Sequence, residues 1–202
     1  HLRALLQSDV AEISQISGYL VESGGKRLRP ALTALGARAV GHQGDVSRLM
    51  CVGELIHLGS LLHDDVVDGA DLRRGRAAAH RIHGSAVTIL TGDFCLARAV
   101  QLAAEEGGHS VVTHLSRAVT KMAEGEVLQL KRSGDLDCSL EDYLNVIDRK
   151  SAALISWCVS AGALAAENPE AATALAAYGR AVGRAFQVTD DVLDYAEGTG
   201  KT

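Results

Sequence analysis

The chain reads Leu-Leu-His-Asp-Asp-Val-Val-Asp at residues 61–68 and Phe-Gln-Val-Thr-Asp-Asp-Val-Leu-Asp at residues 186–194, and these two segments decide its fold. Each segment surrounds an aspartate pair with apolar residues and places a further aspartate four residues after the first. Residues four apart share one face of an α-helix, so both segments are predicted to be helical, with carboxylates on otherwise apolar helices.

Helical periodicity also marks the rest of the chain, while strand signals are nearly absent. Apolar residues recur at helical spacing, as in Leu49, Val52 and Ile56. We expect about seven long helices with short connections, which predicts an all-α bundle. Turn signals separate the helices at Gly24-Gly25, Gly41 to Asp45, Gly107-Gly108 and Ser133 to Asp137.

Several helix starts are also visible in the sequence. Asn168 before Pro169 is typical of an N-cap followed by a proline at the first helical position. Ser139 with Asp142 three residues later predicts a second capped start. Pro30 is expected to open a further helix.

Composition and charge exclude other classes of protein. The 202 residues are 47% hydrophobic, which argues against disorder, and the net charge of −5 offers no general basic field for nucleic acid. The cysteines lie far apart, which argues against a zinc site or a disulfide framework and favours reduced thiols in the cytoplasm. They are Cys51, Cys95, Cys138 and Cys158.

Neither a secretory signal nor a membrane span is expected. Residues 1–10 carry charge and lack an apolar core. The longest apolar stretch, residues 152–166, contains serine and glycine and is shorter than the roughly 20 residues that a span needs. We expect it to form a buried helix.

The two aspartate clusters indicate a metal site if they are not simply solvated helix faces. Like charges four residues apart destabilise a helix by about 0.2–0.5 kcal/mol per pair, and burying them unpaired costs far more. Divalent cations would neutralise them, and Mg²⁺ prefers carboxylate, water and phosphate oxygens. Because the pattern occurs twice, it favours a metal–phosphate site.

Basic groups are available for the remaining phosphate oxygens. Residues 24–30 carry three cations from a glycine turn into a helix start, Arg73-Arg74 follows the first aspartates, and Lys150-Ser151 precedes the apolar helix. Arginine suits bidentate phosphate binding, although such arginines are also common on solvated loops. His57 lies seven residues before Asp64 on roughly the same helix face, where a structural role is the alternative.

Taken together, these motifs resemble those of the trans-isoprenyl diphosphate synthases, the polyprenyl synthetase family, over essentially the whole chain. The resemblance rests on six motifs: Gly24 to Pro30, Leu61 to Gly75, Gly92-Asp93-Phe94 with Ala97-Arg98-Ala99, Glu124-Gly125-Glu126, Lys150-Ser151, and Phe186 to Asp194. It implies an all-α, isoprenoid synthase-type helical bundle around a central cavity, with the two aspartate motifs facing each other at its mouth.

The resemblance also implies a metal-dependent prenyltransferase that works as a homodimer. Its substrates would be isopentenyl diphosphate and an allylic diphosphate, bound with about three Mg²⁺ ions for which Mn²⁺ can substitute. The implied metal ligands are Asp64, Asp68 and Asp190, with Asp65, Asp191 and Asp194 helping directly or through water.

Each basic or polar residue of the motifs receives an implied role in the same way. The residues implied to face the allylic diphosphate and to take part in catalysis are Arg73, Lys150, Ser151 and Gln187, with Lys201 binding beside them. Those implied to hold isopentenyl diphosphate are Lys26, Arg29, His57 and Arg74. The reaction implied by the resemblance is ionisation of the allylic diphosphate, attack of the isopentenyl diphosphate double bond on the cation, and loss of a proton to the released diphosphate.

Two features depart from the family pattern. Ser151 stands where the family usually has threonine, which keeps the hydroxyl. The sequence ends at Thr202, just after the second motif, where family members continue for roughly a hundred residues of further helices. We therefore expect residues 1–202 to be a single synthase domain that lacks its C-terminal helices.

Other functions explain fewer of these residues. A di-iron bundle would use Glu54 to His57 and Glu106 to His109, but Gly107-Gly108 interrupts the second pair. A P-loop at residues 198–202 lacks the required upstream glycine. A class I terpene cyclase needs no second diphosphate site, and a non-catalytic partner subunit of a heteromeric synthase needs no intact aspartates; both stay as alternatives.

The helix that carries the first aspartates also allows an expectation about the length of the product. Gly59 and Ser60 precede Asp64 by five and four residues, or about 6–7.5 Å along a helix, and neither would block a growing chain. The alternative for Gly59 is close helix packing. In the family that the chain resembles, an aromatic side chain at this depth stops the product at about fifteen carbons, and its absence here implies products of about twenty carbons or more.

Overall fold

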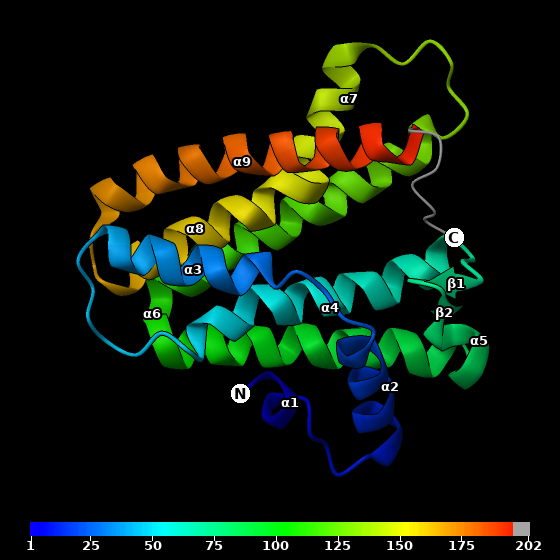
Figure 1. Ribbon diagram of the computed structural model, residues 1–202, viewed down its shortest axis with the longest axis horizontal. Coiled ribbons are helices and arrows are strands. Elements are labelled where there is room, and N and C mark those ends of the chain that lie inside the picture. Colours follow the sequence, from blue (N-terminus) through cyan, green and yellow to red (C-terminus); the bar gives the residue numbers. More distant parts are fainter. Residues whose placement is uncertain (196–202) are drawn as a thin grey trace.

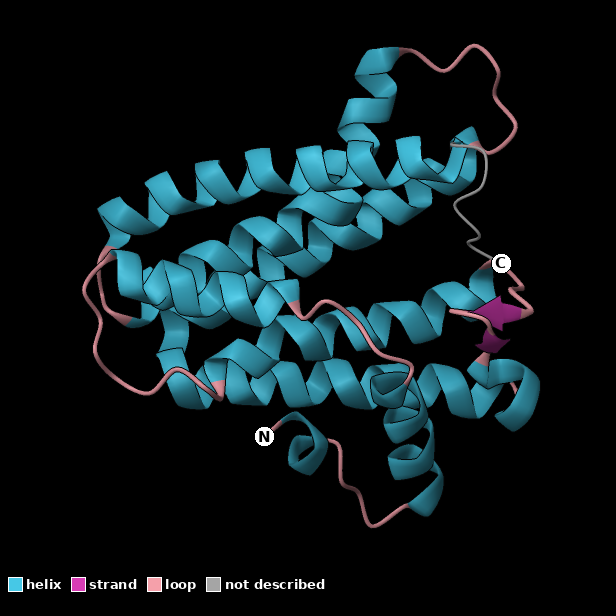
Figure 2. Cartoon of the chain, in the orientation of Figure 1, coloured by secondary structure: helices cyan, strands magenta, loops and turns pink. Residues whose placement is uncertain are grey.

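The structure, a computed structural model, describes residues 1–195 as a bundle of α-helices (Figures 1 and 2). The elements before the long helix α6 are α1 (Leu2–Leu5), α2 (Ala11–Glu22), α3 (Leu28–Ala39), α4 (Leu49–Val67), β1 (Leu72–Arg73), β2 (Arg76–Ala77) and α5 (Ala79–His83). From there the chain forms α6 (Ser85–Arg132), α7 (Leu140–Ile147), the π-helical turn η1 (Asp148–Ala152), α8 (Ala153–Ala165) and α9 (Pro169–Tyr195). The predicted all-α class is confirmed, with one short antiparallel hairpin added in the described residues.

Helix starts agree with the capping residues. The side chain of Asn168 accepts a backbone N–H at 3.1 Å as α9 begins at Pro169. Ser139 accepts a backbone N–H at 3.1 Å as α7 begins. α3 begins at Leu28, so Pro30 lies within the first turn rather than opening it.

The turn predicted at Gly107-Gly108 divides α6 into two halves. Gly108 has φ 62° and ψ −158°, a conformation that residues with a Cβ rarely adopt. The two halves run in nearly opposite directions across Figure 1, one against α4 and the other against α8. The predicted turn is therefore confirmed, and α6 acts as two antiparallel helices.

One helix among the described residues meets a length and composition criterion for crossing a membrane. It is α6, with a window of mean hydropathy 1.3, of which 39% is buried in the bundle. Length and composition alone are weak evidence for a span. The expectation that the chain has no span stays a prediction.

Helix α9 approaches η1 and α8 closely because two of its glycines lie at the contact. A Cβ atom on Gly183 would lie 2.6 Å from Cα of Ala152, and one on Gly179 would lie 2.8 Å from a Cα atom of α8. Gln187 and Asp191 continue the same face of α9 at four-residue spacing. The glycine contact therefore sets the position of the second aspartate cluster relative to η1.

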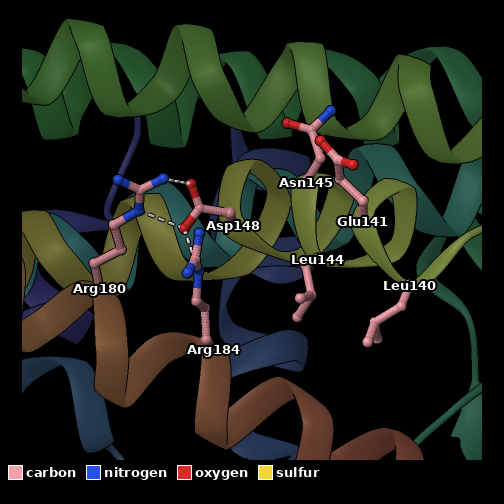
Figure 3. Close-up of a pocket in the computed structure, with 7 residues that line it drawn as sticks. All are labelled: Leu140, Glu141, Leu144, Asn145, Asp148, Arg180 and Arg184. Atoms are coloured by element: carbon pink, nitrogen blue, oxygen red, sulfur yellow. Dashed lines mark hydrogen bonds and ion pairs between the residues drawn. The ribbon is translucent and has the colours of Figure 1, made fainter.

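A charge cluster also holds η1 on α9. Asp148 is only 8% exposed and accepts hydrogen bonds from Nε of Arg180 at 2.5 Å and from Nε of Arg184 at 2.7 Å (Figure 3). Burial alone would raise the pKa of Asp148, but the hydrogen bonds from the two arginines lower it below its ordinary value. The carboxylate therefore stays charged and keeps both arginines bound.

Replacing Gly183 with alanine should push α9 away from η1, because the new Cβ would lie 2.6 Å from the Cα atom of Ala152. We expect the free energy of unfolding to fall by about 1–3 kcal/mol, the usual range for overpacking. Chemical denaturation measures this change. Gly18→Ala is the control, because nothing lies within 4 Å of a Cβ there. Equal losses in both variants would contradict the packing argument.

Candidate functional site

The two predicted aspartate clusters lie at the same end of the bundle. α4 and α9 both finish at this end, beside the β1–β2 hairpin and α7 (Figure 1). The side chains on these two helix ends belong to segments separated by more than a hundred residues in the sequence. The bundle therefore brings both acidic segments to one end, as the family resemblance implied.

The first cluster occupies the end of α4. Asp64 is half-buried, Asp65 is buried, and Asp68 is exposed at the helix terminus. Arg73 donates from Nε to Oδ1 of Asp65 at 2.7 Å and forms a second bond from Nη2 to the same oxygen. Oδ2 of Asp65 is buried without a hydrogen-bond partner. Asp65 is therefore held by the hairpin, with one oxygen still unsatisfied.

The second cluster occupies the last turns of α9. Asp190 and Asp191 are half-buried and Asp194 is exposed. Oδ1 of Asp191 accepts a hydrogen bond from Gln187 at 2.8 Å, and Oδ2 accepts one from the hydroxyl of Tyr143 at 2.6 Å. Burial and the hydrogen bond to Asp191 raise the pKa of Tyr143 to about 12, so this phenol stays protonated and donates.

The π-helical turn η1 brings two further predicted residues to the site. Ser151 donates from Oγ to Oε1 of Gln187 at 2.6 Å, which links it to the second cluster. Nζ of Lys150 lies 2.6 Å from Oε2 of Glu126, a residue of α6. Such turns are frequent at functional sites, because they interrupt regular helix spacing.

The electrostatics near Asp64 fit a bound divalent cation. Burial, followed by the charge of Glu126, raises the pKa of Asp64 to about 6, although Lys150 opposes the shift. Oε1 of Glu126 and Oδ2 of Asp65 are both buried without a hydrogen-bond partner. Crowded carboxylates with unsatisfied oxygens are the donors that Mg²⁺ and Ca²⁺ prefer.

No group of three or more histidine, cysteine or acidic side chains in residues 1–195 is already gathered around one point. Mg²⁺ usually takes only one or two carboxylates and keeps water or binds substrate phosphate oxygens. A gathered set of three is therefore not needed for the site to accept this ion.

A group of arginines surrounds a separate part of α4. Arg27 forms an ion pair with Glu54, which is only 5% exposed, and donates from Nη2 to the carbonyl oxygen of Val21 at 3.0 Å. Burial lowers the pKa of Arg29, whose Nε atom is buried without a hydrogen-bond partner. Arg27 is therefore neutralised by Glu54, whereas Arg29 keeps an N–H group that is free to donate a hydrogen bond.

The glycine turn and the hairpin meet beside this group. Arg74 donates from Nη1 to the carbonyl oxygen of Gly24 and to Oγ of Ser23, the latter at 3.4 Å. A Cβ on Gly25 would lie 3.4 Å from the Arg74 guanidinium. The segment around Gly25 therefore lies against the second arginine of the hairpin, while Lys26 is exposed.

His57 lies on α4 within the field of these arginines. Burial, followed by the charges of Arg29, Arg74 and Arg73, holds its pKa well below the ordinary value of 6.5. The ring is therefore neutral at physiological pH. A neutral imidazole can donate a hydrogen bond to an anion without adding to the positive charge of the arginines.

The structure places all but one of the predicted site residues, and Lys201 lies outside the described residues. Sequence reasoning assigned no role to Glu126 or Tyr143. Glu126 lies in a quoted motif, and its acidic character beside Lys150 could have suggested a partner. Tyr143 carries no such signal, because its contact with Asp191 depends on how α7 folds back onto α9.

The expectation that Gly59 lines a product pocket is wrong. A Cβ on Gly59 would lie 2.9 Å from the carbonyl oxygen of Gly92, so this glycine serves the contact between α4 and α6. Ser60 is half-buried and shares the helix face of Asp64, one turn away. Residue spacing along α4 could not show which side of the helix faces α6.

Comparison with known proteins was made on the sequence and on the fold. Residues 10–202 match the sequence profile of the family described as polyprenyl synthetase. Octaprenyl diphosphate synthase of Escherichia coli (strain K12) is 45% identical over 192 residues, which cover 94% of this chain and 59% of that protein. All-trans-nonaprenyl-diphosphate synthase (geranyl-diphosphate specific) of Rhodobacter capsulatus is 36% identical, with the same shares covered.

Solved structures agree with this result. A polyprenyl synthase from Caulobacter crescentus CB15, complexed with calcium and isoprenyl diphosphate, superposes with a TM-score of 0.92 at 46% identity, over 96% of this chain and 60% of that one. A decaprenyl diphosphate synthase from Rhodobacter capsulatus gives 0.92 at 42%, over 96% and 61%. The isoprenoid synthase-type bundle is thereby confirmed, and the chain spans about three fifths of the relatives' length.

The lowered pKa of His57 predicts a specific dependence of stability on pH. Below its ordinary pKa of about 6.5 the unfolded chain binds a proton that the folded chain does not, so stability falls as the pH falls. Between about pH 7 and about pH 5.5, wild type should lose about 1 kcal/mol more than His57→Gln. Denaturant titrations at both pH values measure this difference. Identical pH profiles for the two proteins would contradict a neutral, half-buried His57.

Proposed function

Because the chain belongs to the polyprenyl synthetase family, we propose that it is a prenyltransferase that joins isopentenyl diphosphate to an allylic diphosphate. The observation that carries this proposal is the presence of two aspartate-bearing helix ends beside a separate group of arginines. The acidic clusters suit metal ions that hold one diphosphate, and the arginines around His57 suit a second anion. A class I terpene cyclase, which uses one diphosphate, has no use for the second group.

Members of the family use a divalent metal. We propose that Asp64, Asp68 and Asp190 hold it, in the form of about three Mg²⁺ ions that Mn²⁺ can replace, and that Asp194 assists. When bound, the metal would withdraw charge from the departing diphosphate. Asp65 and Asp191 act beside these ligands, because each already accepts hydrogen bonds from the protein.

The remaining residues divide between two diphosphates. The residues proposed for the allylic diphosphate are Arg73, Lys150, Ser151, Gln187 and Lys201. Those proposed for isopentenyl diphosphate are Lys26, Arg29, His57 and Arg74. Two of the first set are already paired with acids, Arg73 with Asp65 and Lys150 with Glu126, so they are held in place before the substrate arrives.

The reaction follows from this arrangement. The bond between the allylic carbon and the diphosphate oxygen breaks, and its electron pair leaves with the diphosphate, whose growing charge the cations stabilise. The double bond of isopentenyl diphosphate then forms the new carbon–carbon bond. A proton passes to the released diphosphate and restores an alkene. Water has to be excluded from the site throughout, because a water molecule would react with the allylic cation.

The product is proposed to be a long trans-polyprenyl diphosphate. The names of the relatives describe octaprenyl, nonaprenyl and decaprenyl diphosphate synthases. Ser60 is small and half-buried one turn from Asp64, at about 6 Å along α4, so its own side chain would not block a growing chain at that level. Both observations support a product of about twenty carbons or more, because the chain can grow past the level of Ser60 on α4.

Loss of one aspartate from either acidic cluster should strongly reduce turnover by the full-length protein. Asp64→Ala and Asp190→Ala are each expected to lower kcat/KM by at least about 100-fold, the scale of a main electrostatic contribution. Incorporation of labelled isopentenyl diphosphate, with an allylic primer and Mg²⁺, measures this loss.

The matched control is Asp137→Ala, which removes an exposed carboxylate from the loop before α7. It should leave turnover within about 2-fold, because an exposed loop charge is screened by solvent. Full activity of the wild-type protein in a chelator would overturn the proposed function.

A bulky side chain at Ser60 should shorten the product. Ser60→Phe is expected to shift products toward about fifteen carbons, because an aromatic ring one helical turn from Asp64 blocks elongation at that depth. Chromatography of the dephosphorylated products, with several allylic primers, measures chain length. Ser60→Ala is the control and should keep the wild-type product, and unchanged products from Ser60→Phe would show that the growing chain takes another route.

A further inference from the structure

Tyr143 belongs to a helix that otherwise has little to do with the bundle core. In α7 only Ile147 is buried, while Leu140 and Glu141 are exposed. The helix is joined to α9 at two levels, by the hydroxyl of Tyr143 on Asp191 and by the charge cluster of Asp148 five residues later. The contact of Tyr143 is thus made to the acidic site and not to an apolar core.

The space beside these contacts is open. Figure 3 shows the groove between α7 and α9, where Asp148 lies between Arg180 and Arg184 and Leu144 lies on the same side of α7 as Leu140. An open groove has no closely packed side chains that would hold α7 against α9. α7 is also tied to α6, through the ion pair of Asp142 with Arg132 at 2.7 Å, so its place on the bundle does not depend on the Tyr143 hydroxyl alone.

Both oxygens of Asp191 are occupied by donors that come from different elements. Tyr143 of α7 holds Oδ2 at 2.6 Å, and Gln187 of α9 holds Oδ1 at 2.8 Å. Gln187 in turn accepts the hydroxyl of Ser151 from η1 at 2.6 Å. A hydrogen-bonded chain of four side chains therefore fixes the carboxylate plane of Asp191, and Tyr143 is its outermost member.

We infer that Tyr143 is a positioning residue for the second aspartate cluster, which it serves by holding the carboxylate of Asp191. The inference rests on the proposed function, since it assumes that this cluster binds metal with diphosphate. Residues that orient ligating carboxylates typically change metal affinity by about 10–100-fold when they are removed. Tyr143 would act in this way without touching metal or substrate.

The test removes the hydroxyl alone. Tyr143→Phe in the full-length protein keeps the ring, so its melting temperature should stay within about 2 °C of wild type, because one partly solvated hydrogen bond contributes little to folding. Binding of Mn²⁺ in the presence of inorganic diphosphate, followed by electron paramagnetic resonance, should weaken by about 10-fold. The control is Tyr178→Phe, which removes the hydroxyl of an exposed tyrosine on α9 and should leave binding unchanged.

A double-mutant cycle separates positioning from a structural role. If Tyr143 acts through Asp191, Tyr143→Phe should change Mn²⁺ binding by less than about 2-fold in an Asp191→Ala background, because coupled residues are not additive. An equal loss in both backgrounds, or unfolding of Tyr143→Phe, would show a structural role and overturn the inference.

Failure of the inference and failure of the proposed function give different results. If wild type binds Mn²⁺ with diphosphate and Tyr143→Phe binds it equally well, the role of Tyr143 is overturned and the proposed function stands. If wild type binds neither Mn²⁺ nor diphosphate, the proposed function is overturned and the role of Tyr143 is overturned with it.

Discussion

Neutralisation of the buried Asp148 carboxylate is the interaction on which the geometry of the second acidic segment depends. Asp148 is only 8% exposed, and both of its partners, Arg180 and Arg184, come from α9. Breaking these bonds would leave the buried carboxylate short of donors, which is unfavourable even though both arginines are partly exposed. Sliding or turning α9 relative to η1 would therefore lower the stability of the protein. The residues that follow on α9, Gln187 and Asp191, are placed by this restraint.

Backbone contacts extend the same rigidity to the other helices. Gly183 meets Ala152 between α9 and η1, and Gly59 meets Gly92 between α4 and α6. Contacts of this kind involve few rotatable side chains, and interiors packed this closely deform little. Both acidic helix ends are thus supported by close helix contacts a short distance below them. Rigid support of this kind favours a site whose charges have to be in place before the substrate ionises.

The sequence predicted the fold class and most of the helix ends, because periodicity, Asn168 and Ser139 are local signals. The repeated aspartate pattern favoured a metal–phosphate site, and the resemblance to the family implied that the segments of Asp64 and Asp190 face each other. The sequence could not predict which residues pair across the bundle. Tyr143 with Asp191 depends on a π-helical turn that no residue pattern announces. The side of α4 on which Gly59 lies likewise depends on where α6 packs, which spacing along one helix does not specify.

The turn η1 also has a consequence for how this protein can vary in length. A π-helical turn holds one residue more than an α-helical turn, so residues 148–152 carry one residue beyond what a continuous helix would need. Deleting one residue would restore α-helical spacing and rotate α7 by about 100° relative to α8. Tyr143 would then leave Asp191, although every motif residue would still be present. In an alignment of homologues, a single-residue gap within residues 148–152 would therefore mark the proteins in which the second acidic cluster has lost its tyrosine.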